Sequence, residues 1–139
     1  LLTVKNYLSE RLSIYGLLIS LSIIIGFHIL VIAGIIPYQI VWGGRLENFS
    51  QMLSFEAVSI SLNLLMIAIV AIYANFLKCK INQVAIQIGL WVMFVLFFIN
   101  TIGNLFSINE LEKLIFTPVT LLLSLFSLRL ALNKSKSLP

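Results

Sequence analysis

The chain has 139 residues, of which 60% are hydrophobic and only 10% are charged, and its mean hydropathy is +1.10. A soluble core of this size cannot hide so much apolar surface, which excludes an ordinary water-soluble domain and predicts one integral membrane domain over residues 1–139. The net charge of +4 would suit nucleic acid only if the basic residues gathered on one soluble face, and here they lie at the ends of apolar stretches. We therefore expect the lipid bilayer as a partner, and no nucleic acid.

Four apolar stretches follow one another along the chain, at residues 12–36, 53–77, 84–105 and 114–132. Each is long enough for the roughly 20 residues that an α-helix needs to cross about 30 Å of hydrocarbon. Strands are disfavoured because the stretches are continuously apolar rather than alternating, and an open sheet in lipid leaves amide groups without partners. The first stretch is too long for the apolar region of a signal peptide, so we interpret it as an uncleaved span. The sequence predicts an all-α fold, a bundle of four transmembrane helices.

Lysine and arginine side chains gather on one side of the four stretches. This set comprises Lys5, Arg11, Lys78, Lys80, Lys134 and Lys136. On the opposite side, Arg45 and Lys113 are offset by three glutamates. Because connections rich in lysine and arginine stay in the cytoplasm, we expect both termini to be cytoplasmic and the protein to lie in the plasma membrane of a bacterial cell.

The residues that carry metal and redox chemistry are scarce. The single cysteine, Cys79, excludes an intramolecular disulfide, and the sequence has no aspartate and only one histidine. The usual clusters of zinc or magnesium ligands are therefore missing, and we expect no metal site and no cofactor. No GxSxG motif is present. The sequence therefore disfavours an enzymatic function, although His28 and Glu56 would form an acid–base pair if their side chains were in contact.

Five polar residues inside the predicted spans are the candidate ligand- or ion-binding residues, because polar groups in hydrocarbon are costly. They are His28, Glu56, Asn63, Asn100 and Thr120. Counting about 1.5 Å per residue from the outer end of each span places all five in the outer half of the bilayer. We expect them to line one polar pocket that opens outward. The alternative is that each one only makes a hydrogen bond between packed helices.

The first outer connection contains a proline, two glycines and charged residues between Pro37 and Gln51. Pro37 should end the first helix, and the glycine pair allows a tight turn. Trp42, Arg45 and Glu47 are the candidates for a loop that caps the pocket. The alternative is a loop that lies flat on the membrane surface.

Small and polar side chains recur every three or four residues along the fourth stretch. They are Thr117, Thr120, Ser124, Ser127 and Ala131. This spacing places them on one helical face, which we expect to pack against the other helices.

Two function classes fit these features. The first is transport or channel-like handling of an ion or small molecule, in which Glu56 and His28 bind a cation or carry a proton; a homo-oligomer would help four helices to enclose a pathway. The second is a non-catalytic binding or accessory protein, of the sensor or immunity type, that holds a lipophilic ligand. The stretch 100–104 resembles the Asn-x-x-Gly-Ser stretch of small four-helix fluoride channels, but their following glycine- and phenylalanine-rich segment is absent, so no activity is carried over.

Overall fold

A computed structural model describes residues 7–108 and 110–133 of the chain. Within these residues it contains four α-helices and no strand: α2 (Glu10–Ile32), α3 (Phe49–Tyr73), α4 (Gln83–Leu105) and α5 (Glu110–Ala131). All four contain a segment long and apolar enough to cross a membrane. The prediction of an all-α fold is therefore confirmed for the described residues, and the four helices have the length and composition that spanning a membrane requires.

The first helix differs from the predicted span 12–36 at both ends. It begins at Glu10 because Ser9 caps it, with the backbone N–H of Leu12 donating to the Ser9 hydroxyl at 3.1 Å. It ends at Ile32, before Gly34, whose φ of +72° lies in the left-handed region that a helix cannot continue through. The predicted span was too long at this end because residues 33–36 are apolar without being helical.

The second helix is shifted relative to the predicted span 53–77. Asn48 caps it, accepting a hydrogen bond of 2.8 Å from the backbone N–H of Gln51, so the helix begins four residues early at Phe49. It ends at Tyr73, and Asn75 then takes a φ of +60°. The capping residues are polar, and a search for apolar runs does not include them.

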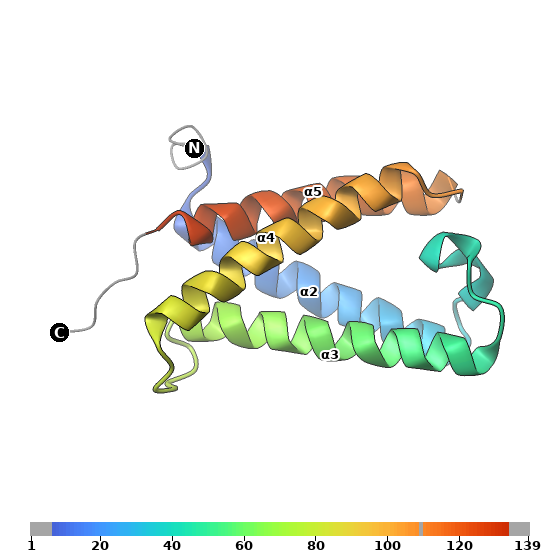
Figure 1. Ribbon diagram of the computed structural model, residues 1–139, viewed down its shortest axis with the longest axis horizontal. Helices are drawn as coiled ribbons and strands as arrows, with labels where there is room; N and C mark the ends of the chain where they lie inside the picture. Colours follow the sequence, from blue (N-terminus) through green and yellow to red (C-terminus); the bar gives the residue numbers. More distant parts are fainter. Residues whose placement is uncertain (1–6, 109, 134–139) are drawn as a thin grey trace.

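The helices form two pairs that separate toward one end (Figure 1). Helix α2 packs against α3, α4 lies along α5, and α2 also contacts α5. Helix α4 approaches α3 where the short connection 74–82 joins them, and then diverges from it. We call this end, which carries Cys79, the Cys79 end. The opposite end, which carries residues 33–48, is the loop end.

The half of the bundle next to the Cys79 end holds the main apolar core. All four helices contribute to it, and its most deeply buried side chains are Leu17, Leu21, Val70, Leu90, Met93, Leu123 and Leu130. A smaller apolar cluster of Val31, Val41, Leu46 and Met52 anchors the loop between α2 and α3. The loop is therefore held against the helix ends by buried side chains.

A chain of hydrogen bonds joins three helices at the Cys79 end. The Tyr73 hydroxyl donates to Glu10 at 3.0 Å and accepts from the Asn133 amide at 2.9 Å. Arg129 donates to the Asn133 side chain at 2.7 Å and to the carbonyl oxygen of Leu8 at 2.6 Å. The ends of α2, α3 and α5 are thus tied by charged and polar groups near the membrane surface.

The polar stripe of α5 faces the inside of the bundle. Thr120, Ser124, Ser127 and Ala131 are buried, and Ser124 donates to the carbonyl oxygen of Phe94 on α4 at 3.4 Å. These small side chains allow α4 and α5 to approach closely along their length.

Candidate functional site

Glu56 is the centre of a group of polar contacts that joins α2, α3 and the loop between them. It lies on α3 seven residues, or about two turns, after Phe49. Its side chain is completely buried, with 0% exposure. One carboxylate oxygen, Oε2, lies 2.5 Å from Nδ1 of His28, and the other, Oε1, accepts a hydrogen bond of 2.9 Å from the indole N–H of Trp42. Both oxygens therefore have partners, one from α2 and one from the loop.

His28 reaches Glu56 because α2 and α3 are neighbours that run in opposite directions. It lies four residues before the end of α2, and its side chain is 14% exposed. Phe27 packs edge-on against the His28 ring with centroids 5.9 Å apart, and against Phe116 of α5 at 5.3 Å. These aromatic contacts hold the end of α2 against α5 and restrict the imidazole to the side of Glu56.

Trp42 reaches Glu56 from the loop between α2 and α3. It begins the short 3₁₀ turn Trp42–Gly44, and its φ of +56° lies in the left-handed region that residues other than glycine rarely occupy. The indole also packs edge-on against Phe55 with centroids 5.0 Å apart. Such a backbone is retained only where the surroundings hold it. The buried anchors of the loop and the bond to Glu56 hold it here.

The charge balance of the His28–Glu56 pair permits a proton to move without changing the charge of the site. If the proton is on His28, the pair is a cation and an anion; if it is on Glu56, both groups are neutral. Burying an unpaired carboxylate in this way would be strongly unfavourable. The contacts with His28 and Trp42 compensate for the cost of removing the carboxylate from water. The arrangement is suited to holding, releasing or exchanging one cation.

Two other candidate residues make packing contacts away from Glu56. Asn63 lies two turns further along α3 and donates to the carbonyl oxygen of Ser59 in its own helix at 2.8 Å. Thr120 belongs to the interface between α4 and α5, where its hydroxyl accepts from Thr101 at 3.0 Å and from Asn104 at 3.4 Å. The structure thus contains two polar clusters, and the hydrogen bonds it shows do not join the five candidates into one group.

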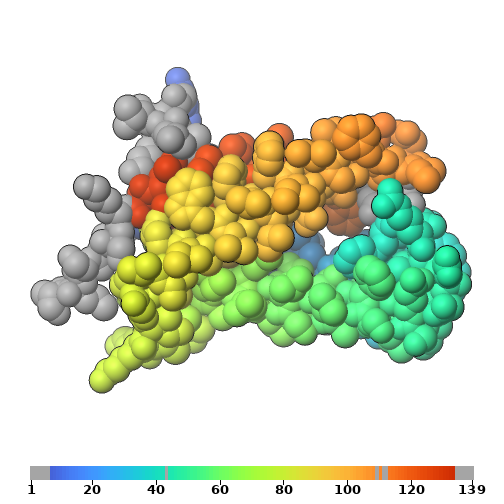
Figure 2. All heavy atoms as spheres, in the orientation of Figure 1, coloured from blue at the N-terminus to red at the C-terminus, as the bar shows by residue number. Residues whose placement is uncertain are grey.

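Asn100 behaves differently from the others. It is exposed on α4, and among the residues that the structure describes its side chain has no hydrogen-bond partner. Figure 2 shows a hollow between α3 and α4 toward the loop end, where the two helices have diverged. An amide on an exposed face of a membrane-spanning helix is costly without a partner.

The charged loop residues do not cover Glu56. Arg45 and Glu47 are exposed, and the backbone N–H of Glu47 donates to the side chain of Gln51 at 2.9 Å. Of the three residues expected to cap a pocket, Trp42 alone contacts the buried carboxylate. The cap acts through an uncharged N–H group, which costs less to bury than an arginine.

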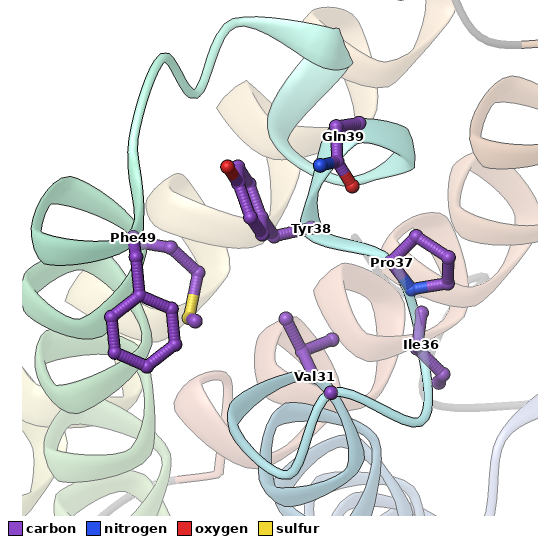
Figure 3. A pocket seen from close by; sticks show the side chains of 8 residues that line it. Val31, Ile36, Pro37, Tyr38, Gln39 and Phe49 are labelled. Carbon is purple, nitrogen blue, oxygen red and sulfur yellow. The ribbon is translucent and has the colours of Figure 1, made fainter.

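An apolar pocket of about 300 Å³ lies beneath the loop (Figure 3). Its lining comprises Val31, Gly34, Ile36, Pro37, Tyr38, Gln39, Phe49 and Met52. None of the five candidate polar residues lines it. Val31 follows His28 by three residues and Met52 precedes Glu56 by four, so the pocket lies about one turn beyond the His28–Glu56 pair.

Among the described residues, no three histidine, cysteine or acidic side chains are grouped so that they could hold a metal ion. Comparisons with protein-family models, with curated proteins and with solved structures found no match to this chain.

Proposed function

We propose that this protein moves a small ion or molecule across a plasma membrane in step with protons, and that Glu56 and His28 form its binding centre. The observation that supports this most is the complete burial of Glu56 with both carboxylate oxygens bonded to other segments. Ionisable pairs inside a membrane are expensive, and where they occur they typically belong to proton or ion pathways. A purely structural contact would be served more cheaply by apolar side chains.

The orientation that we propose places the loop end outside and both termini in the cytoplasm. Arg11, Lys78 and Lys80 all lie at the Cys79 end, and such positive charges are retained on the cytoplasmic side. Lys5, Lys134 and Lys136, which contribute to the same charge asymmetry, lie outside the described residues. In this orientation Glu56 belongs to the outer half of the membrane.

Trp42 is the outer gate in this proposal, and the apolar core is the inner barrier. A cation from outside would reach Glu56 once the indole N–H leaves the carboxylate. The core of large apolar side chains between Glu56 and the Cys79 end excludes water in the conformation described. Transport therefore requires a second conformation, in which the hydrogen bonds around Tyr73 and Arg129 at the Cys79 end separate.

Proton flux in reconstituted vesicles tests this function. Purified protein would be placed in liposomes that contain a pH-sensitive dye, and a pH gradient would be imposed with sodium, potassium or a small ammonium salt on one side. We expect wild type to dissipate the gradient faster than empty vesicles with at least one of these ions. Glu56→Gln should abolish this effect, because the amide keeps the shape but cannot carry the charge, whereas Glu47→Gln, at an exposed loop position, should retain it.

Two results would overturn the proposal. One is a flux no faster than that of empty vesicles with every ion, and the other is an unchanged flux in a folded Glu56→Gln variant. The first result would favour the second candidate function, a binding protein without transport. The apolar pocket beneath the loop supports that alternative, because its volume of about 300 Å³ is at the lower end of ordinary ligand pockets. Saturable binding of a small apolar fluorophore, lost in Met52→Trp, would then be the expected result.

A further inference from the structure

The hollow between α3 and α4 is open at the surface of the bundle (Figure 2). Near the Cys79 end the two helices touch, because a Cβ placed at Gly89 would lie 3.0 Å from Cδ1 of Ile69. Asn100 follows Gly89 by eleven residues, about three full turns, so it lies on the same side of α4. Beyond Gly89 the two helices diverge (Figure 2), and the helical phase places Asn100 on the side of α4 that faces the space between them.

Trp42 contacts two neighbouring residues of α3, Phe55 and Glu56. Phe55 precedes Ile69 by fourteen residues, about four turns, and therefore shares the side of α3 that faces α4. The indole of Trp42 packs against Phe55 and at the same time bonds to Glu56. The indole thus covers the carboxylate from the side of Phe55.

We infer that the hollow is a lateral entrance from the bilayer, and that it admits a small amphipathic ammonium ion whose N–H groups replace the indole N–H at Glu56. This inference rests on the proposed function and adds to it a ligand class and a route. The carboxylate supplies the complementary charge, and both groups now bonded to its oxygens come from nitrogen-bearing rings. The Asn100 side chain supplies a further acceptor along the route.

The same geometry couples the ligand to a proton. Nδ1 of His28 lies 2.5 Å from the carboxylate, so an imidazolium and an ammonium ion would compete for one negative charge. Besides Glu56 and His28, four charged side chains are described at the loop end: Arg45 and Glu47 are exposed, and Glu110 and Lys113 pair with each other at 3.8 Å at the start of α5. A charged imidazole and the ligand's ammonium group would therefore repel each other across Glu56.

Tryptophan fluorescence in lipid nanodiscs tests the inference. The chain has two tryptophans, so in a Trp91→Phe variant the tryptophan emission comes from Trp42 alone. Titration with 2-phenylethylammonium at neutral pH should change the emission saturably. The neutral analogue 2-phenylethanol and the cation tetraphenylphosphonium, which has no N–H group, should not produce this change.

Three variants separate the roles of the residues. Glu56→Gln should remove the saturable change. Asn100→Leu should weaken it by about tenfold, the effect expected from losing one hydrogen bond to a charged group. Asn63→Leu, whose amide bonds only within α3, should bind like wild type and serves as the matched control.

The outcomes distinguish this inference from the proposed function. Equal responses to 2-phenylethanol and the ammonium ion would overturn the ligand class and indicate a crevice for neutral apolar molecules or lipid chains. Equal binding by Asn100→Leu and Asn63→Leu would overturn the lateral route. In either case, proton flux that depends on Glu56 with sodium or potassium would leave the proposed function intact, whereas loss of that flux as well would remove both.

Discussion

The indole N–H of Trp42 donates to the carboxylate of Glu56 at 2.9 Å, and fourteen residues separate the two along the chain. This bond joins a surface loop to the most deeply buried acidic group among the described residues. The state of one side chain is thereby linked to the position of the loop. A substitution of either residue should therefore change the surroundings of the other.

Trp42→Phe should destabilise the protein by about 1–3 kcal/mol, because it leaves Oε1 of Glu56 buried without a donor. Phenylalanine keeps much of the ring contact with Phe55, so the loss reports mainly the hydrogen bond. Thermal denaturation in detergent measures the effect. Trp91→Phe is the matched control, because Trp91 is 40% exposed and contacts Phe94 through its ring. Equal melting temperatures for the two variants would contradict the bond.

Ser124→Leu should cost on the order of 1–3 kcal/mol through overpacking, because Ser124 is 1% exposed between α4 and α5. Ser61→Leu should have little effect, since Ser61 is exposed and bonds only to the carbonyl oxygen of Ala57 in its own helix. Unfolding by increasing amounts of sodium dodecyl sulfate would compare the two. A stable Ser124→Leu variant would mean that this face of α5 can separate from α4 without cost.

Gly16→Ala should weaken the contact between α2 and α5, because the new Cβ would lie 2.5 Å from the ring of Phe126. The ring must shift, and we expect a loss of about 1–3 kcal/mol. Gly26→Ala has no atom within 4 Å of its new Cβ and should gain up to about 1 kcal/mol from helix propensity. Opposite shifts in melting temperature are therefore expected from the same substitution on one helix.

Labelling with a membrane-impermeant thiol reagent tests the proposed orientation. Cys79 is exposed between α3 and α4, so it should react in opened membranes but not in intact cells. Arg45→Cys in a Cys79→Ser background places a thiol on the exposed loop, and it should react in intact cells. The reverse pattern would place the loop end in the cytoplasm.

The sequence by itself determined the number of helices and their type, because long, continuously apolar runs have no other stable form in lipid. It located the ends less well. Ser9 and Asn48 begin their helices as polar caps outside the apolar runs, and Gly34 and Asn75 end them through left-handed backbone. These local signals concern hydrogen bonds and dihedral angles rather than hydropathy.

Only the tertiary structure decided which polar residues meet. Depth in the membrane follows from counting residues, and it grouped Glu56 with His28 but also with Asn63, Asn100 and Thr120. Contact depends in addition on helix pairing and on rotation about each helix axis. A membrane-spanning helix is apolar around most of its circumference, so its sequence pattern does not show which side faces the bundle. Close packing at small residues such as Gly89 sets that rotation, and it leaves Asn100 exposed while Glu56 is enclosed.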